Sequence, residues 1–460
     1  MSRLRDRLWS LLLKLQANRL KGQFCMSRCA VIWIVLAIVC GMPFPEVHSA
    51  DSWTFLISAG DVDRSHLPLK AVVEIDPLHA SRRVKVSLPD GSSVTGQFIS
   101  DPQFSHAVSV KKSTVRGTIL FILPKLISCE SIELKAQLVP DEPTVPAAVE
   151  KGLRWTSDNG SAKLLLGGKM LVEYVMPLYD ASTEETRVQT YKPFHHVYDS
   201  RSGIRLTKGD GGQYTHHRGI FFGYNKIGHG TDGKMVSDTW HCKDKARQEH
   251  REVLEQIAGP IEARQCVRIE WTGGDASLLA SETRELDIVP LSAGTMIDFS
   301  SRLVTLAGPM RLEGDPQHAG VHFRAAQEVA ETTKTQTYYL RPGVKAEPGE
   351  FRNWPEDKTF INAAWHAAIF VVGGQRYSVL RINTQRNPGE ARMSERDYAR
   401  FGSYFEFELL PEKPLEVFYR WWIQPGELSL EEATRIAADW ATPAKIVVTP
   451  SVDASILNSN

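Results

Sequence analysis

The sequence has no excess of charge of either sign and no long hydrophobic run. Lys and Arg number 54, and so do Asp and Glu, which gives a formal net charge of zero over 460 residues. Nucleic-acid and anionic-membrane partners favour a basic protein surface, so we expect neither. The longest apolar stretch, residues 30–42, has about 13 positions, whereas a membrane-spanning helix needs about 20. We therefore expect no membrane span in the mature chain.

This short apolar stretch instead has the features of a secretory signal peptide. Arg28 stands just before it, and small residues follow at Ser49 and Ala50, an arrangement typical of cleaved leaders. We predict a signal peptide over residues 1–50, with Met26 as an alternative start, and a secreted or periplasmic protein. A short uncleaved anchor is the alternative.

Cysteine is scarce, and its spacing contains no pairs. Three of the six cysteines fall in the leader, which leaves Cys129, Cys242 and Cys266 far apart. Such spacing provides neither a disulfide framework nor a paired metal-ligand motif. A single bridge between Cys242 and Cys266 stays open, because secreted proteins reach an oxidising compartment.

Strand signals dominate the rest of the chain, so we predict an all-β fold. Residues 51–139 hold runs such as "LKAVVEI" and "RRVKVSL" between turn residues, which predicts a small β-sandwich. Prolines at 140, 143 and 146 mark residues 140–152 as a linker, because proline interrupts strands. Residues 153–441 contain too many strand signals for an immunoglobulin-sized sandwich. We predict one large two-sheet supersandwich there.

One convincing helix is expected, near the C-terminus. The stretch "SLEEATRIAADW" begins at Ser429, with Glu432 three residues later, which is a capping box. Apolar residues then recur at helical spacing. Residues 442–460 are predicted to form a flexible tail.

Histidine is plentiful in the large domain, where ten of the 14 lie between residues 195 and 366. The stretch "QYTHHRGIFFGY", residues 213–224, places His216, His217 and Arg218 side by side. Read as a strand, it points His216 and Arg218 to one face and His217 to the other. The adjacent histidines then cannot reach one ion. Gly219 and Gly223 leave the His217 face open to a ligand or to another backbone.

A second polar row lies in "HAGVHFRAA", residues 318–326. Strand alternation places His318, His322 and Arg324 on one face and apolar residues on the other. Two imidazoles and a guanidinium in a row suit sugar hydroxyls or a carboxylate, because they offer directed donors and a proton carrier. For each of these histidines, a structural role within the core is the alternative.

Two further stretches supply candidates. "DTWH" offers Trp240 as a platform for a sugar ring, together with His241. In "RDYARFGSYFEFELL", alternation places Glu406 and Glu408 on one face, where either would serve as a base if that face lined a cleft. No tight histidine spacing with a third ligand is visible, so we assign no metal ligand and no cofactor.

Several of these motifs together resemble one family. The stretches "KPFHHVYDSRSGIRLTKGDGG", "THHRGIFFGYNK", "HAGVHFRAA" and "RFGSYF" resemble a family of secreted bacterial proteins, frequent in planctomycetes, that carries the label "methane oxygenase PmoA". The resemblance covers about residues 53–440. The membrane methane monooxygenase subunit of that name spans the membrane several times, whereas this chain has one short apolar run. We therefore do not carry the label over as a function.

The large domain is also similar to the galactose-mutarotase type of β-supersandwich. This resemblance implies a concave sheet whose histidines and arginine bind sugar hydroxyls, with one histidine as general acid and a glutamate as base. Carried over to this sequence, it implies His217, His322 and Glu406 as catalytic residues. Together with the motifs themselves, it gives a predicted substrate-binding set of His216, Arg218, Trp240, His241, His318 and Arg324.

Three functions stay open on this basis. The first is a carbohydrate-active enzyme, an epimerase, lyase or hydrolase with a histidine general acid. The second is a non-catalytic protein that binds glycans. The third is a metalloprotein that uses His216 or His217 with His241 or His318.

Overall fold

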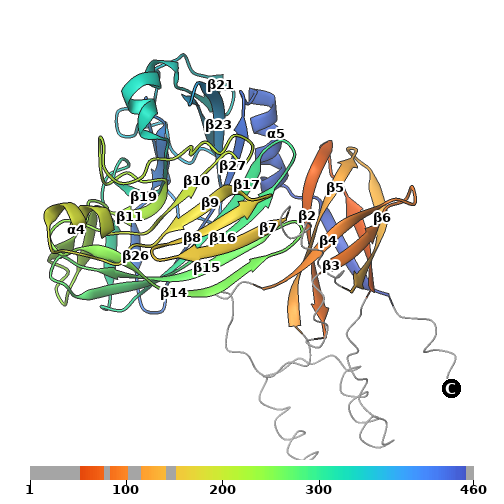
Figure 1. Ribbon diagram of the computed structural model, residues 1–460, viewed down its shortest axis with the longest axis horizontal. Helices are drawn as coiled ribbons and strands as arrows, with labels where there is room; N and C mark the ends of the chain where they lie inside the picture. The colour runs from red at the N-terminus through yellow and green to blue at the C-terminus, as the bar shows by residue number, and fades with distance from the viewer. Residues whose placement is uncertain (1–51, 77–82, 102–114, 141–151, 452–460) are drawn as a thin grey trace, which may run out of the picture. The chain divides into compact units, whose positions relative to one another are not determined.

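A computed structural model describes residues 52–76, 83–101, 115–140 and 152–451 (Figure 1). The predicted signal peptide and nearly all of the predicted linker lie outside these residues. Strands far outnumber helices, and pairing is antiparallel in all four sheets. The predicted all-β fold is therefore confirmed. Within the described residues, no helix is long and apolar enough to cross a membrane.

The N-terminal region forms one seven-stranded sheet that curls around its own core. In spatial order its strands are β2 (Arg64–Ile75), β5 (Val115–Leu126), β4 (Ser93–Ser100), β3 (Arg83–Ser87), β6 (Ser131–Val139), β1 (Ser52–Ser58) and β28 (Lys445–Pro450). Apolar side chains alternate along these strands with exposed polar ones, because one face of the sheet is buried and the other is solvated.

The prediction of a flexible tail is wrong for residues 445–450, which form the last strand of that sheet. Residues 445–450 form β28, which pairs with β1 from Trp53 opposite Pro450 to Ser58 opposite Lys445. Ile446 and Val448 pack against the core that Phe55 occupies. The alternation in "KIVVTP" is a strand signal of only six residues, and its partner strand lies at the start of the described chain.

The large domain contains an eight-stranded and a nine-stranded sheet, with a four-stranded sheet beside them. The first contains β24 (Arg392–Arg396), β25 (Arg400–Tyr404), β19 (Ala319–Arg324), β11 (Ile220–Tyr224), β10 (Phe194–Val197), β9 (Lys169–Val175), β8 (Ser161–Leu166) and β7 (Leu153–Asp158). The second contains β14 (Arg247–Ala258), β15 (Ala263–Thr272), β16 (Leu278–Pro290), β17 (Thr295–Thr305), β27 (Leu415–Pro425), β23 (Gln375–Asn383), β22 (Trp365–Val372), β20 (Tyr338–Arg341) and β21 (Val344–Lys345). The third contains β13 (Met235–Ser237), β12 (Lys226–His229), β18 (Met310–Glu313) and β26 (Phe407–Leu409).

The two larger sheets pack face to face through one apolar core. Phe323 of β19 and Phe401 of β25 lie 5.9 and 5.8 Å from Trp421 of β27, measured between ring centroids. As expected from alternation, Val321 and Phe323 point into this core. The opposite face of β19 is therefore the one that carries His322 and Arg324.

Helices are few. The predicted C-terminal helix is α5 (Leu430–Ala441), and Ser429 and Glu432 form the expected capping box. A second helix, α4 (Glu184–Thr190), was not predicted from the sequence, and Thr183 caps it. A π-helical turn at Val329–Thr333 and a 3-10 turn at Lys334–Gln336 complete the helical segments of the described chain.

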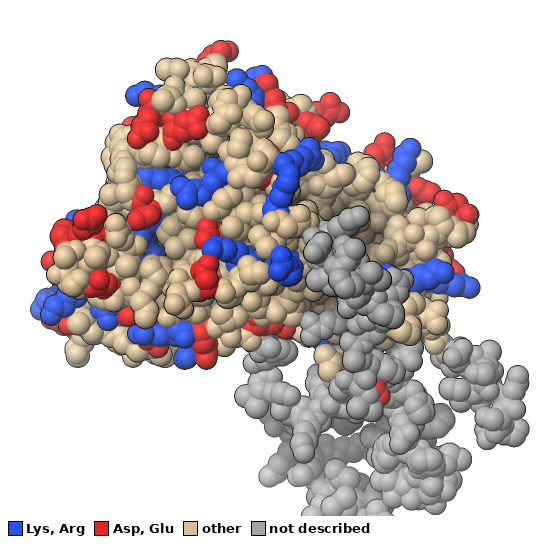
Figure 2. All heavy atoms as spheres, viewed as in Figure 1, with Lys and Arg blue, Asp and Glu red and all other residues tan. Residues whose placement is uncertain are grey.

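Cys242 and Cys266 are both buried, free thiols, so the bridge left open by the sequence is not formed. On the face shown in Figure 2, Lys and Arg alternate with Asp and Glu over the described surface, which agrees with the balanced charge of the chain.

Candidate metal centre

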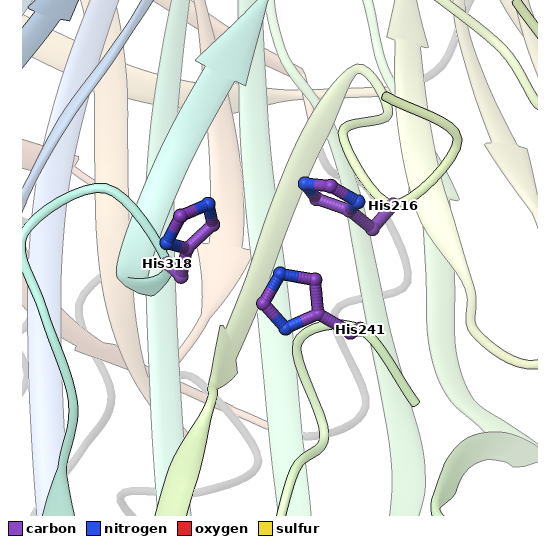
Figure 3. Close-up of side chains that lie close together, drawn as sticks. All are labelled: His216, His241 and His318. Atoms are coloured by element: carbon purple, nitrogen blue, oxygen red, sulfur yellow. The ribbon is translucent and has the colours of Figure 1, made fainter. Parts of the chain in front are cut away.

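Three turns on the outer face of the eight-stranded sheet bring together His216, His241 and His318, named here the three-histidine cluster (Figure 3). His216 lies in the turn before β11, His241 in the turn after β13, and His318 in the turn before β19. One ring nitrogen from each lies within 4.8 Å of the other two. The rings of His216 and His241 are 4.4 Å apart, and those of His241 and His318 are 4.8 Å apart.

The segment that carries His216 is a turn, which corrects the strand predicted for residues 213–219. Tyr214 has a φ of +58°, and its carbonyl accepts a hydrogen bond from the amide of His217 at 3.0 Å. Strand alternation therefore does not apply to this pair, and the rings of His216 and His217 lie 4.3 Å apart. The glycine-rich sequence just before it allows the chain to fold back over the sheet.

The glycines that sequence analysis singled out admit another backbone rather than a ligand. A Cβ on Gly219, where φ is +43°, would lie 2.0 Å from the carbonyl oxygen of His195. A Cβ on Gly223 would lie 3.0 Å from the carbonyl oxygen of Thr239. Close approach at these two points holds the His216 turn and the His241 turn against the sheet.

Two carboxylates orient the cluster. Nδ1 of His241 lies 2.8 Å from Oδ2 of Asp238, and Nδ1 of His318 lies 2.9 Å from Oδ1 of Asp315. A carboxylate on Nδ1 fixes that nitrogen as the N–H donor, which leaves Nε2 as a lone-pair donor. Nε2 of His216 is buried, without a hydrogen-bond partner among the described residues. All three rings point toward one another (Figure 3).

The electrostatics keep His216 neutral. Burial, and next the nearby charge of Lys192, lower the pKa of His216 to about 2. A metal ligand must be the neutral imidazole, because the lone pair of a protonated nitrogen is occupied. The side chains of His241 and His318 are 24% and 28% exposed, so the cluster also remains open to solvent.

Two lysines lie beneath this region, and burial lowers the pKa of both. Lys192 has a pKa of about 8; it donates to the carbonyl oxygen of Trp240 and lies 4.9 Å from the ring centroid of Phe221. Lys208 has a pKa of about 7, and its Nζ donates to the carbonyls of Gly209, Gly211 and His217. These bonds hold the loop before the His216 turn.

The predicted catalytic histidines lie below the cluster. His217 and His322 are 2% and 0% exposed, and burial lowers the pKa of each well below its usual value. Nε2 of His322 lies 2.9 Å from the carbonyl oxygen of Ala319. Contact with a substrate would require rearrangement around both side chains, and their catalytic roles stay predictions.

Two other predicted binding residues, Trp240 and Arg218, are buried and have no access to solvent. Trp240 is fully buried, so it presents no ring face at the surface for a sugar. Arg218 is buried and donates to the carbonyls of Thr215, Gln189 and Val188, which ties the His216 turn to helix α4. The exposed aromatic side chain beside the cluster is that of Tyr214, 43% exposed and 6.1 Å from the His216 ring.

Glu406 lies in an ion-paired surface network. Its Oε1 accepts from Arg392 at 2.9 Å and from the hydroxyl of Tyr404 at 3.2 Å, and the bond from Arg392 lowers the pKa of Glu406. Such a carboxylate is a weak base. Glu406 and Glu408 are both exposed, whereas Phe405 and Leu409 are buried, as the predicted alternation requires. Tyr404 departs from it and is buried, because the chain leaves β25 at Tyr404 and enters β26, in another sheet, at Phe407. The role of Glu406 as the base stays a prediction.

Asp315 was not among the predicted site residues, although the sequence contains a signal for it. "DTWH" and "DPQH" each place an aspartate three residues before a histidine, and both pairs form the same contact in the structure. No metal ligand was assigned from the sequence. The structure nevertheless brings together His216, His241 and His318, as the metalloprotein alternative requires. His217 is not part of that set.

The fold and the site together describe a β-rich protein whose large two-sheet sandwich carries a three-histidine cluster oriented by two carboxylates. The chain belongs to the family of unknown function DUF6807, whose model matches residues 161–438. The match includes all three histidines and both aspartates. The resemblance to the family labelled "methane oxygenase PmoA" stays a prediction.

Comparison with solved structures returns distant likenesses, and a search of curated proteins finds no match. A glycosyl hydrolase family 38 protein from Enterococcus faecalis has a TM-score of 0.42 at 10% identity, covering 88% of this chain and 48% of its own. An alpha-mannosidase from the same organism has a TM-score of 0.43 at 10% identity, covering 88% and 46%. This chain thus spans about half the length of those two proteins.

A galactose mutarotase-like protein from Clostridium acetobutylicum has a TM-score of 0.29 at 9% identity, covering 59% of this chain and 95% of that one. Likenesses at this level carry no argument about activity.

Proposed function

We propose that this chain is a metalloprotein in which His216, His241 and His318 bind one divalent transition-metal ion. The observation that supports the proposal is the convergence of three imidazole nitrogens within 4.8 Å of one another. The bonds from Asp238 and Asp315 present Nε2 on two of the rings. Carboxylate partners of this kind are typical of histidines that bind metals.

The donor set favours a particular chemistry. Imidazole nitrogens suit Zn²⁺, Cu²⁺, Fe²⁺ and Ni²⁺, and three protein ligands with an open position are typical of catalytic zinc sites. An ion held here would polarise an oxygen of a bound ligand, or lower the pKa of bound water to about 7. We therefore propose Lewis-acid or hydrolytic chemistry at the open side of the cluster.

A carbohydrate ligand is the substrate class we propose for this centre. Tyr214 supports it, since an exposed ring beside a cluster of polar groups suits the apolar face of a sugar. Secretion is part of the same proposal, and rests on the leader sequence alone. The mass of the purified mature protein tests it, and an intact residue 1 or 26 at the N-terminus would contradict it.

Metal analysis of the dialysed protein tests the centre directly. We expect about one equivalent of metal in the wild type, or after addition of Zn²⁺ or Co²⁺, and less than a tenth of that in His216→Ala, His241→Ala and His318→Ala. His66→Asn, at an exposed position of the small sheet, is the control and should bind as the wild type does. Failure of the folded wild type to bind either ion ends the proposal.

Turnover is a separate question. A panel of sugars and glycans should be processed by the metal-loaded protein and not by the metal-free protein. Binding without turnover would assign the protein to the non-catalytic alternative, while leaving the metal centre intact.

A further inference from the structure

Two buried arginines lie directly opposite each other below the three-histidine cluster. Arg324 of β19 and Arg400 of β25 are partners in the antiparallel register, and they are 0% and 1% exposed. Like charges directly opposite on neighbouring strands repel each other. Burial of a charge without a partner costs several kcal/mol. This arrangement calls for an anion to compensate the two charges.

Among the described residues, the charge of Asp397 acts on Arg324, but no carboxylate forms an ion pair with either arginine, since none lies within the 4.0 Å ion-pair distance of either guanidinium. Nη1 of Arg324 donates to the carbonyls of Ala325 and Tyr398 at 3.1 and 2.7 Å, and Nη1 of Arg400 donates to the hydroxyl of Ser394 at 2.8 Å. All of these acceptors are neutral.

Unpartnered nitrogens remain on both arginines and on a neighbouring histidine, whose neutral ring supplies one N–H donor. Nε and Nη2 of Arg324, Nε of Arg400 and both ring nitrogens of His217 are buried without a hydrogen-bond partner in the described chain. The ring of His217 lies 6.5 Å from that of Tyr398, and the Arg324 guanidinium lies 4.4 Å from the same Tyr398 ring. His217 and Arg324 therefore both lie beside Tyr398.

Of these residues, His217 lies next to the proposed metal centre. The His217 ring is 4.3 Å from that of His216 and 6.0 Å from that of His318. Tyr214, which is exposed, lies 5.5 Å from Tyr398, ring to ring. The exposed Tyr214 and the buried Tyr398 therefore lie in sequence between solvent and Arg324.

We propose that Arg324, Arg400 and His217 form an oxyanion-binding subsite next to the three-histidine cluster, which takes a carboxylate or phosphate group of the ligand once the side chains that bury it have moved aside. The guanidinium fork binds such groups through paired hydrogen bonds. That this anion belongs to the molecule that reacts at the metal rests on the proposed function. The subsite itself does not depend on the metal.

Anion binding to the metal-free protein tests the subsite. Glucuronate, with glucose as its neutral counterpart, tests a carboxylate source, and inorganic phosphate tests a phosphate source. Each is titrated at constant ionic strength against chloride, with melting temperature and calorimetry as readouts. We expect saturable binding of glucuronate or phosphate, no response to glucose, and at least tenfold weaker binding in Arg324→Met.

Matched variants keep the result interpretable. Arg268→Met, at a partly exposed position on β15, should bind the anion as the wild type does. Arg400→Lys keeps the charge but not the fork, and serves if Arg324→Met fails to fold. It should also weaken binding at least tenfold. Equal anion binding in the wild type and these two subsite variants overturns the proposal, and so does a wild type that responds to neither anion.

Failure of the subsite and failure of the metal centre can be told apart. Arg324→Met should still bind one equivalent of Zn²⁺, whereas His318→Ala should lose the metal and still bind the anion. A protein that binds the anion but no metal retains the subsite and loses the proposed function.

Discussion

Asp315 and His318 form a turn in which the carboxylate lies 2.9 Å from Nδ1 of the imidazole, and Asp238 and His241 repeat it at 2.8 Å. In both pairs the aspartate stands three residues before the histidine. Two separate turns therefore present Nε2 in the same way toward one point.

Removing one of these carboxylates should weaken metal binding without abolishing it. Asp315→Asn keeps the shape of the side chain but loses the charge that orients and polarises His318. We expect a 10–100-fold lower affinity for Zn²⁺ at unchanged stoichiometry, measured by competition with a chelator. Asp232→Asn, on an exposed turn, is the control. An unchanged affinity in Asp315→Asn would show that the carboxylate has no such role.

Gly219→Ala should destabilise the protein far more than an alanine at an open turn. The new Cβ would meet the His195 carbonyl at 2.0 Å on a backbone with φ of +43°, so either the strand or the His216 turn must shift. We expect a loss of at least about 2 kcal/mol in the free energy of unfolding. Gly203 also has a positive φ, but a Cβ there would meet no atom within 4 Å. Gly203→Ala should therefore cost about 1 kcal/mol in the free energy of unfolding. Urea denaturation measures both, and equal costs would contradict the close approach.

Stability should fall in mild acid through the buried histidines, with His366 as the test case. Burial lowers its pKa from 6.5 to about 4, although Glu395 acts in the opposite direction. Between these two pH values the unfolded chain binds the proton and the folded chain does not, so stability is lost as pH falls. His366→Gln should remove up to about 1.4 kcal/mol per pH unit of that slope.

Urea unfolding of metal-free protein at pH 7 and pH 5 measures the slope. The exposed variant His66→Asn should keep the wild-type slope. The same pH dependence in His366→Gln as in the wild type would be inconsistent with a neutral buried imidazole.

The C-terminal strand should contribute to the stability of the small sheet. Val448 of β28 pairs with Phe55 of β1 and packs against the small core, so Val448→Asp places a charge against apolar side chains. We expect a loss of about 2 kcal/mol in the free energy of unfolding. Val447 is 59% exposed, and Val447→Asp should change stability by less than about 0.5 kcal/mol. Similar effects at both positions would mean that β28 is not paired.

Local patterns predicted much of the fold for definite reasons. Alternation in "HAGVHFRAA" predicted the core face of β19, because a strand buried on one side has a period of two. The capping box at Ser429 predicted α5, because its two bonds join residues three positions apart. The pairing of β28 with β1 was not predictable in this way, since nothing local specifies a partner so distant in the chain.

The sequence by itself determined the all-β class, the helix start and the histidine-rich region, since each depends on neighbouring residues. The tertiary structure alone decided which histidines meet. His216, His241 and His318 stand on three separate turns, and the distance between them depends on strand pairing and on the backbone contact at Gly219. It also decided burial, which places His217, His322 and Arg324 below the surface and leaves the three-histidine cluster open to solvent.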